Sequence, residues 1–457
     1  MKTHFNDTIA AMATAPGEAG ISIIRISGPD TYRIADHVFA GRGPKPSERP
    51  PFTFAHGAIC QEGTRLDDVL MLFMRGPRSY TGEDQVEIHG HGGSVVSRRI
   101  LRCVMEAGAR LAEPGEFTRR AFLNGRMDLT QAEAVIDLIK ARSERAAQAA
   151  VEQLSGSISQ SLSTIYDECL SVVADLEATM DFPEDELPEA VMRTVIDRLR
   201  EVHQRSNDLI ATWSEGRLLR EGALIVIAGR PNVGKSTLLN ALLGQSRAIV
   251  SDVPGTTRDT IEEGYVLDGI PLRLVDTAGL RDAACAIEQE GIRRSRDQLE
   301  KADGTLYLID ASTGMTQDDH AQLAQLNPQQ TLVVWNKMDL CPTTPPPSSG
   351  RTECHLSLKD PQAITVIRKK LAEQLSAGYR QGAEQQAVIS ERHRAILVQF
   401  NDHLHQALAL VQENRDDHIP LACAHLRDGL EALGAVTGRV YHQELLDHIF
   451  SRFCIGK

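Results

Sequence analysis

The sequence predicts a multidomain protein that combines an α+β domain, a helical domain and an α/β domain. Residues 1–125 mix strand-like and helical segments, whereas residues 126–218 and 383–457 show mainly the helical spacing of apolar residues. Residues 219–382 alternate short apolar strands with polar helical stretches, which is typical of a mainly parallel sheet covered by helices. Neither helical segment offers much core alone, so we predict one discontinuous helical domain with the α/β domain inserted in it.

The size and composition of the chain agree with this organisation. Its 457 residues correspond to about three domains, and 42% hydrophobic and 24% charged residues are typical of globular proteins. No apolar run approaches the ~20 residues of a membrane span, and the first residues lack the basic-then-apolar pattern of a secretory signal. The 8 cysteines are scattered without a C-x-x-C pair. They argue against both a disulfide framework and a zinc site, and they favour the cytoplasm.

The first domain contains segments with strand or helix spacing, namely strands over 21–26, 69–74 and 85–89 and a helix over 94–107. We expect the glycines of Gly90-His-Gly-Gly to end the third strand. His89 and His91 lack a third ligand nearby in the sequence, so we interpret them as ordinary turn histidines and not as a metal site.

From Met127 onward the spacing of apolar residues predicts long helices. This helical spacing covers residues 127–174, 189–214, 388–411, 420–433 and 438–453. Thr130 and Glu133 fit a capping box, in which a hydroxyl and a carboxylate satisfy the free N–H groups at a helix start. We interpret this region as a helical bundle without chemistry of its own.

A glycine loop follows the predicted strand Ala223–Ala228 and precedes a helical segment. The residues Gly229-Arg-Pro-Asn-Val-Gly-Lys-Ser have the spacing and context of a P-loop. Glycines at 229 and 234 let backbone N–H groups turn toward a phosphate, and the helix start adds its positive dipole end. We therefore predict that Lys235 reaches the β- and γ-phosphates and that the Ser236 hydroxyl binds Mg²⁺.

Two further motifs end predicted strands of the same domain. In Asp276-Thr-Ala-Gly279, the carboxylate can hold the water shell of the metal and the Gly279 amide can reach a γ-phosphate. In Asn336-Lys-Met-Asp339, the last carboxylate can accept both N1–H and the exocyclic amine of guanine, which adenine cannot supply. Because the motifs follow one another at the carboxyl ends of strands, they predict a GTP site.

The switch region is predicted in Gly255-Thr-Thr-Arg-Asp259, with Thr257 as a second Mg²⁺ ligand. Leu280 stands where many small GTPases carry the glutamine that orients the attacking water. Leucine cannot do this, so another residue must position the water. The positive charge at the transition state must come from an arginine or from a bound monovalent cation. An arginine finger contributes about 10³–10⁵ in rate, which is about 4–7 kcal/mol.

With these motifs the sequence resembles the MnmE (TrmE) family, bacterial GTPases of tRNA wobble-uridine modification. Further matching segments are Arg25-Ile-Ser-Gly, Tyr80-Thr-Gly-Glu-Asp, Gly90-His-Gly-Gly, Pro114-Gly-Glu-Phe, Arg120-Ala-Phe-Leu-Asn-Gly, Asp276-Thr-Ala-Gly-Leu-Arg and Phe453-Cys-Ile-Gly-Lys457. The resemblance covers the whole chain. It implies an inserted Ras-like G domain and a cytoplasmic, K⁺-stimulated GTPase. Together with the FAD-dependent partner MnmG, such an enzyme adds a carboxymethylaminomethyl or aminomethyl group at C5 of the tRNA wobble uridine.

The resemblance also implies a homodimer formed by N-terminal domains that bind 5-formyl- or 5,10-methylene-tetrahydrofolate. The matching positions for this ligand are Arg25, Glu87, Arg126 and Lys457. Family members often carry lysine at position 126, and arginine keeps the charge with a different geometry. Cys454 matches the cysteine that the family needs for tRNA modification.

In the G domain, the resemblance implies a K⁺ ion near Asn232, Ser251, Val253 and Thr256, and a water-positioning role for Glu288. The ion would supply the charge that Leu280 leaves open. The guanine pocket would be closed by Ser357-Leu-Lys359, which departs from the family's Ser-Ala-Lys/Arg pattern. The expected nucleotide contacts are Gly229, Asn232, Val233, Gly234, Lys235, Ser236, Thr237, Ser251, Thr256, Thr257, Asp276, Thr277, Ala278, Gly279, Asn336, Lys337, Asp339 and Ser357.

A P-loop domain alone also fits a GTP-switched binding module, such as a ribosome-assembly factor with helical adaptor arms. Such a factor needs neither a folate site nor a terminal thiol, so the alternatives are distinguished by Arg25, Glu87, Arg126 and Cys454. The net charge of −13 disfavours non-specific nucleic-acid binding. We therefore expect MnmG to carry much of the tRNA contact.

Overall fold

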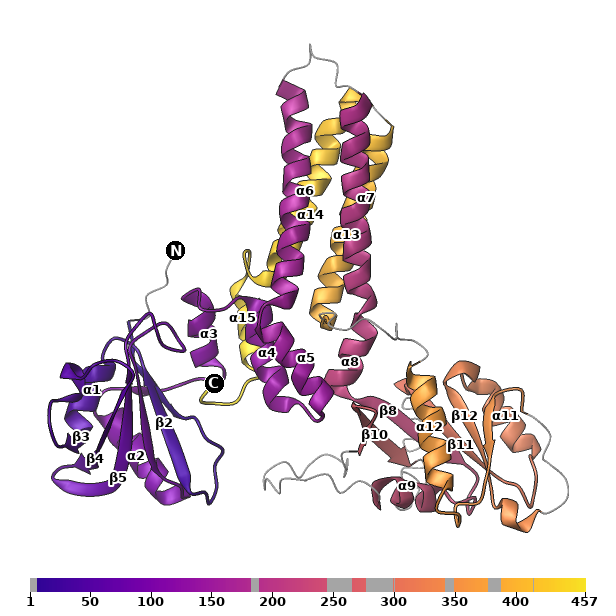
Figure 1. Cartoon of the computed structure of the whole chain (residues 1–457), viewed down its shortest axis with the longest axis horizontal. Coiled ribbons are helices and arrows are strands. Elements are labelled where there is room, and N and C mark those ends of the chain that lie inside the picture. The colour runs from indigo at the N-terminus through magenta and orange to yellow at the C-terminus, as the bar shows by residue number, and fades with distance from the viewer. Residues whose placement is uncertain are drawn as a thin grey trace, which may run out of the picture. The chain divides into compact units, whose positions relative to one another are not determined.

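The structure is a computed structural model that describes residues 6–181, 189–244, 265–276, 299, 301–341, 349–376, 388–413 and 415–457. Figure 1 shows the helices and strands of the chain, which divides into two compact units. One unit contains residues 1–136, 153–203 and 396–457, and the other contains residues 137–152 and 204–395. None of the described helices combines the length and the apolar composition that crossing a bilayer would require.

The N-terminal part of the first unit is a 7-stranded sheet in the order β3-β4-β5-β6-β2-β1-β7. Its strands are β1 (Ile9–Met12), β2 (Ile21–Ser27), β3 (Phe39–Gly41), β4 (Thr53–Gln61), β5 (Thr64–Met74), β6 (Gln85–His91) and β7 (Arg110–Leu111). The helices of this region are α1 (Thr31–Val38), α2 (Ser94–Glu106) and α3 (Glu116–Leu123). The three strands and the helix that the sequence predicted here are confirmed.

The third strand ends inside Gly90-His-Gly-Gly as predicted, but β6 continues through His91, two residues beyond the predicted end at residue 89. Gly90 and His91 still pair with Ser22 and Ile21 on β2, and this pairing keeps the two residues in the sheet. The hydrogen-bonded ladder of a neighbouring strand thus outweighs the local preference of glycine for turns.

Alternation along the strands gives this sheet two different faces. Side chains such as Ile24, Met71 and Ile88 point into a core that they share with α1 and α2. The opposite face is covered near β1 by Phe117 of α3, which packs against Ile9. The residues that the sequence places on this second face, Arg25 and Glu87 among them, therefore stay accessible beyond the edge of α3.

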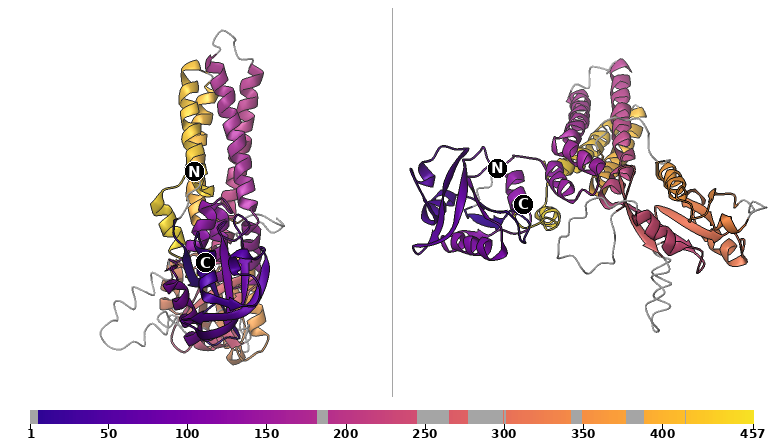
Figure 2. Two further views of the ribbon diagram at one scale, coloured as in Figure 1. Left: turned by 90° about the vertical axis from the view of Figure 1, so that its left-hand side faces the viewer. Right: turned by 60° about the horizontal axis from the view of Figure 1, so that its bottom comes forward.

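Long helices follow: α4 (Leu129–Lys140), α5 (Glu144–Leu154), α6 (Ser157–Asp181), α7 (Glu189–Ala211) and α8 (Trp213–Glu221), and later α13 (Glu391–Gln412), α14 (Ile419–Thr437) and α15 (Gln443–Phe450). Helices α6, α7, α13 and α14 run side by side (Figures 1 and 2). Helical residues from before and after the α/β domain, namely 153–203 and 396–457, thus share one compact unit.

The capping box at the start of α4 lies two residues earlier than predicted. The Gln131 N–H donates to the Asp128 carboxylate at 3.0 Å, and the Asp128 N–H donates to the Gln131 side-chain oxygen at 3.0 Å. Thr130 lies inside the helix and donates its hydroxyl to the same carboxylate. The Asp-x-x-Gln pair thus satisfies the N–H groups of Asp128 and Gln131 in the way that the predicted Thr-x-x-Glu pair would satisfy the N–H groups two residues later.

The second unit contains a 6-stranded sheet in the order β13-β12-β11-β8-β10-β9, in which only the pairing of β9 with β10 is antiparallel. The strands are β8 (Ala223–Gly229), β9 (Tyr265–Leu267), β10 (Ile270–Asp276), β11 (Gly304–Asp310), β12 (Thr331–Asn336) and β13 (Thr352–His355). Helices α9 (Lys235–Gly244) and α12 (Ala363–Ser376) pack on one face, and α11 (Gln317–Gln325) packs on the other. The predicted mainly parallel α/β domain is confirmed.

Candidate functional site

The loop between β8 and α9 has a backbone that only glycine fits at two positions. Gly229 and Gly234 have φ angles of 133° and 107°. A Cβ atom on Gly229 would lie 2.4 Å from the Leu308 carbonyl oxygen, and one on Gly234 would lie 2.5 Å from the Asn336 amide nitrogen. The loop therefore presses against the carboxyl ends of β11 and β12, and it leads directly into the N-terminus of α9.

Lys235 opens α9 and folds back over this loop. Its ammonium donates to the carbonyl oxygens of Gly229 at 3.0 Å and Arg230 at 2.8 Å. The side chain is buried at 7% exposure, so the charge is held in place by backbone oxygens. A cation fixed at the edge of a glycine loop and a helix N-terminus fits a bound phosphate group.

The next residue, Ser236, is directed toward the end of β10. Its hydroxyl lies 3.3 Å from a carboxylate oxygen of Asp276. A hydroxyl and a carboxylate at this separation offer the oxygen ligands that Mg²⁺ prefers, either directly or through its water shell. The structure thus brings together two residues that lie 40 positions apart in the sequence.

Asp339 marks the far end of the site. One carboxylate oxygen accepts from the Ser357 hydroxyl at 2.8 Å, and the other accepts from the Lys359 ammonium at 2.8 Å. The hydrogen bond from Lys359, followed by the one from Ser357, lowers the pKa of Asp339. An ionised carboxylate in fixed orientation is the acceptor pair that a guanine edge requires.

Asn336 ties the two ends of the site together. Its amide donates to the Val233 carbonyl oxygen at 2.8 Å, inside the glycine loop. Its side-chain oxygen accepts from the backbone N–H of Leu358 at 3.0 Å. One buried side chain therefore links the phosphate loop to the segment that holds Asp339.

Lys337 makes a second link between these parts. Its ammonium donates to the Asn232 carbonyl oxygen at 2.9 Å and to Asp310 at 2.7 Å. Burial acts to raise the pKa of Asp310, but hydrogen bonds from Lys337 and Ser312 lower it overall. Asn232 and Lys337 both adopt positive φ angles, of 62° and 63°, at the two ends of this contact.

The other predicted residues of this domain divide into two groups. Thr237 lies in the first turn of α9 and is exposed. The residues predicted for the switch segments lie outside the described part of the chain: Ser251, Val253, Thr256, Thr257, Thr277, Ala278, Gly279 and Glu288.

A second constellation lies on the outer face of the N-terminal sheet. Arg25 on β2 is the cross-strand partner of Glu87 on β6, and 2.9 Å separates Arg25 Nε from Glu87 Oε1. Both side chains retain 14% exposure. The guanidinium lies over the rings of Tyr80 and Phe117, at 5.4 Å and 5.5 Å from their centroids. The site therefore offers a cation, a carboxylate and aromatic surface within one small area.

The segment Cys454–Lys457 reaches the same place. The carbonyl oxygen of Gly456 accepts from Arg25 at 3.3 Å, and a Cβ atom on Gly456 would lie 2.2 Å from the Met12 carbonyl oxygen. Burial, followed by the nearby charge of Arg25, lowers the pKa of Lys457. The Cys454 side chain is exposed. Glycine at position 456 thus explains how this segment approaches β1 so closely.

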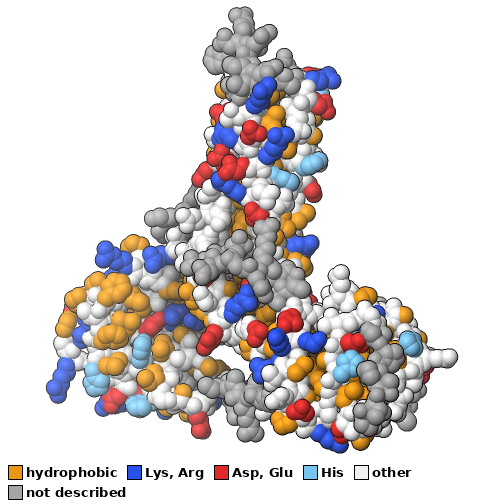
Figure 3. Space-filling view, turned by 45° about the vertical axis from the view of Figure 1, so that its right-hand side comes forward, with side chains coloured by type: hydrophobic (Ala, Val, Ile, Leu, Met, Phe, Trp, Pro, Cys, Tyr) orange, Lys and Arg blue, Asp and Glu red, His pale blue; other side chains and the backbone are white. Residues whose placement is uncertain are grey.

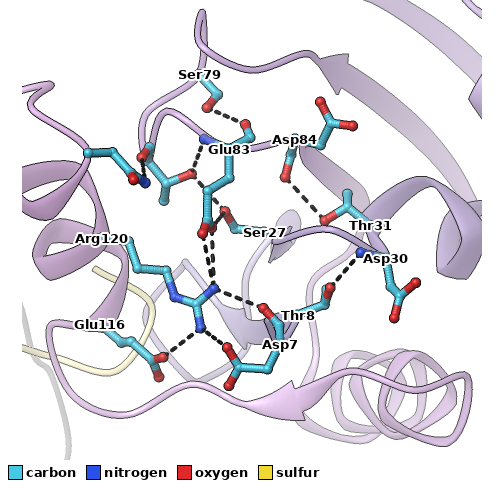
Figure 4. A network of polar contacts seen from close by, with 12 residues as sticks. Asp7, Thr8, Ser27, Asp30, Thr31, Ser79, Glu83, Asp84, Glu116 and Arg120 are labelled. Carbon is cyan, nitrogen blue, oxygen red and sulfur yellow. Dashed lines mark hydrogen bonds and ion pairs between the residues drawn. The ribbon is translucent and has the colours of Figure 1, made fainter. Parts of the chain in front are cut away.

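Arg126 approaches the loop that precedes β6. A Cβ atom on Gly82 would lie 3.2 Å from Cγ of Arg126, so the arginine stem packs on this glycine. The loop itself is fixed by Arg120, which is fully buried and paired with Glu83, Glu116 and Asp7 (Figure 4). The structure therefore places Arg126 beside the loop that carries Tyr80.

Sequence reasoning did not assign roles to Tyr80, Phe117 or Asp310. Tyr80 and Phe117 lie in two of the matching segments, and their position on either side of Arg25 follows only from the fold. Asp310 ends a buried strand, as Asp276 does, and this position was a usable signal.

Comparisons with known proteins identify the relatives of this chain. Residues 8–126 match the family described as the GTP-binding protein TrmE N-terminus, and residues 129–454 match the MnmE helical domain. The chain is 42% identical to the tRNA modification GTPase MnmE of Moorella thermoacetica, over 99% of this chain and 100% of that protein. It is 43% identical to the protein of the same name from Geobacter sulfurreducens, over 99% and 100%. The FeoB G-domain from Methanococcus jannaschii is 25% identical over 34% of this chain and 98% of that chain, with a TM-score of 0.25.

Proposed function

The chain belongs to the MnmE family of tRNA modification GTPases, and from this premise we propose its reaction. In this proposal, K⁺ stimulates the hydrolysis of GTP to GDP and phosphate. The hydrolysis drives a complex with the FAD-dependent partner MnmG in the cytoplasm. The complex adds a carboxymethylaminomethyl or aminomethyl group at C5 of the tRNA wobble uridine.

The observation that carries the nucleotide part is the orientation of Asp339. Its two carboxylate oxygens are each held by a donor, Ser357 or Lys359, on the segment after β13. A guanine edge would be recognised there, while the cradle of Gly229 and Gly234 and the ammonium of Lys235 would hold the phosphates. Ser236 and Asp276 fit a Mg²⁺ ion, which when bound would neutralise phosphate charge.

We assign the remaining catalytic roles to residues of the switch segments, which lie outside the described residues. Thr257 is proposed as the second Mg²⁺ ligand and Glu288 as the group that positions the attacking water. Asn232, Ser251, Val253 and Thr256 are proposed to hold K⁺. The exposed position of Asn232 on the glycine loop is compatible with this assignment.

A tetrahydrofolate would be held on the outer face of the N-terminal sheet, where the residues fit its chemistry. The carboxylate of Glu87 can accept N–H groups of a pterin ring, and the half-buried ring of Tyr80 offers flat apolar contact, while the buried ring of Phe117 supports Arg25. Arg25, Arg126 and Lys457 are cationic and suit the carboxylates of the ligand's tail. When bound, the folate would supply the one-carbon unit of the modification.

The same face of the sheet supports a homodimer. Phe54, Leu70 and Ile21 are exposed at 58%, 47% and 60% on strands β4, β5 and β2. Phe54 lies directly opposite Leu72 on the neighbouring strand, and Leu72 lies opposite Glu87. Cross-strand partners point to the same face of a sheet, so this apolar surface is continuous with the Arg25–Glu87 pair. Hydrophobic side chains also gather on the surface of the N-terminal region in Figure 3. An exposed apolar area next to a ligand site favours a second copy of the chain as its cover.

We further propose that residues 1–125 form the folate and dimerisation domain, and that residues 219–382 form a G domain inserted in the helical domain. The helical halves would be residues 126–218 and 383–457. The shared unit of residues 153–203 and 396–457 supports this insertion. The exposed Cys454, in a segment that contacts Arg25 through Gly456, is proposed to act in tRNA modification.

Mass analysis of tRNA nucleosides from cells that lack this chain tests the proposal. The wobble uridine should lose its C5 group, and a copy of the gene should restore it. A copy with Cys454→Ser should restore GTP hydrolysis in extracts but not the modified nucleoside. Unchanged wobble uridine in the deletion strain would contradict the proposed reaction and favour a GTP-switched assembly factor.

A further inference from the structure

Helices α13 and α14 carry a cluster of metal-ligating side chains that the proposed reaction does not use. His403 lies on α13, while His425 and Asp428 lie on α14. One ligand atom from each residue lies within 4.8 Å of the other two. Within the described part of the chain this is the one group of its kind that the geometry brings together.

The packing of the two helices explains why these side chains meet. His425 and Asp428 are separated by three positions and therefore share a face of α14. Next to them, Gly429 lets α13 come close, because a Cβ atom there would lie 3.4 Å from Cβ of His403 and 3.2 Å from the Phe400 ring. The side chains of Phe400 and Leu426 are each only 1% exposed, so the contact between the two helices beside the cluster is tightly packed.

Each of the two imidazole rings has one buried nitrogen without the hydrogen bond that such an atom normally makes. The Nδ1 atoms of His403 and His425 are both buried, and neither has a hydrogen-bond partner among the described residues. Their ring centroids are 5.9 Å apart with an angle of 42° between the planes, so the rings are not stacked. A buried nitrogen without a partner is unfavourable unless something satisfies it. An ion coordinated by the ring nitrogens would do so.

We propose that His403, His425 and Asp428 bind a divalent transition metal ion of the zinc class. Imidazole nitrogen and carboxylate oxygen are ligands that suit Zn²⁺ and Co²⁺, whereas Mg²⁺ and Ca²⁺ prefer an all-oxygen set. Asp428 is exposed, so the ion can enter from solvent and keep water as a further ligand. The bound ion would cross-link α13 to α14.

The cysteine pattern of the sequence gave no sign of this site, because the site contains no cysteine. Its two histidines lie 22 positions apart on different helices, and they meet only when α13 packs on α14. The proposal is independent of the GTPase reaction and of the folate site.

The test uses the full chain, stripped of metal with a chelator and saturated with GDP and Mg²⁺ so that the nucleotide site is filled. Titration with Co²⁺, followed by visible absorption, should show one equivalent bound with nitrogen and oxygen ligands. His403→Ala and His425→Ala should abolish this signal. His405→Ala is the matched control, because His405 is an exposed residue of the same helix outside the cluster, and it should bind as the unchanged protein does.

Asp428→Asn keeps the test decisive if a histidine variant fails to fold. This exposed substitution should weaken Zn²⁺ binding at least about tenfold in calorimetry. It should also remove the rise in melting temperature that Zn²⁺ produces in the unchanged chain. The proposal is overturned if the unchanged chain binds no Co²⁺ or Zn²⁺. It is also overturned if binding persists in His403→Ala, or if Asp428→Asn and His405→Ala bind equally well.

Discussion

Arg25 and Glu87 lie opposite each other on adjacent antiparallel strands, with 2.9 Å between the guanidinium Nε and a carboxylate oxygen. They are separated by 62 positions in the sequence. Nothing local to either residue marks it as part of a site. The register between β2 and β6 makes them partners, and the rings of Tyr80 and Phe117 complete their surroundings.

Glu87→Gln should weaken binding of 5-formyl-tetrahydrofolate, because a neutral amide cannot accept two pterin N–H groups as a carboxylate does. A hydrogen bond to a charged group contributes about 1.5–3 kcal/mol, so we expect a loss of about tenfold or more in calorimetry. Arg98→Ala is the control, since Arg98 is exposed on α2. Equal affinity in Glu87→Gln and the unchanged chain would refute the folate assignment.

Asp339→Asn should change the base preference of the nucleotide site. The amide supplies only one acceptor oxygen, so GTP affinity should fall at least about a hundredfold, because the guanine donors lose their partners. Xanthosine nucleotides, which carry a carbonyl oxygen where guanine carries its amine, should bind better than before. Lys359→Ala should have a smaller effect, because the lysine is 79% exposed. Undiminished GTP binding by Asp339→Asn would show that the base lies elsewhere.

Ser236→Ala should raise the Mg²⁺ concentration needed for half-maximal GTP hydrolysis. The substitution removes one oxygen beside Asp276 but leaves Lys235 and the glycine loop in place. GDP affinity measured in EDTA should therefore match that of the unchanged chain. A parallel loss of GDP affinity in EDTA would mean that the substitution damages the loop, and an unchanged Mg²⁺ requirement would exclude the ligand role.

Arg120→Met should destabilise the N-terminal region. Arg120 has no exposed side-chain surface and pairs with Asp7, Glu83 and Glu116. Its loss removes the cationic partner of Glu83, which is only 14% exposed, and leaves Arg110 as the arginine that still pairs with Asp7 and Glu116. Removing one partner of a buried ion pair costs about 3–5 kcal/mol, which thermal or urea unfolding can measure. Arg33→Ala removes an exposed pair with Asp30 and should change stability little. An equal loss of unfolding free energy in the two variants would contradict the claim that the buried ion pairs of Arg120 stabilise this region more than an exposed pair does.

The same network predicts a loss of stability in acid. Burial acts to raise the pKa of Glu116, but hydrogen bonds from Arg110, Glu113 N–H and Arg120 lower it below its ordinary value of 4.5. Because the folded pKa is the lower one, the carboxylate contributes its full stability above about pH 4.5, and this contribution fades as the pH falls through the folded pKa. The midpoint of urea or thermal unfolding should therefore decrease as the pH is lowered from 6 to about 3. This pH dependence of the midpoint should be weaker in Glu116→Gln. An identical pH dependence in both proteins would contradict the contribution assigned to Glu116.

The glycine loop and the strand ends beside it could be predicted from the sequence because each of these parts is local. Gly229, Gly234 and Lys235 lie in one strand–loop–helix segment, and Asp276 and Asp339 follow the ends of apolar strands. Parallel strands bring such ends to one edge of a sheet, so their meeting follows from the order of the motifs.

Features that depend on packing between distant segments could not be predicted from residue patterns. The pairing of Arg25 with Glu87 depends on strand register, and the buried environment of Arg120 depends on Asp7 and Glu83 arriving from elsewhere. The start of α4 was misplaced for a different reason. Two capping patterns overlap there, and only the structure shows that Asp128 receives the helix N–H group.

The steady-state rate of GTP hydrolysis in K⁺ compared with Na⁺, at equal ionic strength, tests the central claim most directly. Leu280 supplies no group to orient water or to stabilise charge, so the proposed K⁺ ion should replace the effect of an arginine finger. We predict much faster turnover in K⁺, with GTP affinity nearly unchanged between the two salts. Glu288→Ala should remove the K⁺-stimulated turnover while it keeps nucleotide binding. Equal rates in the two salts would contradict the account.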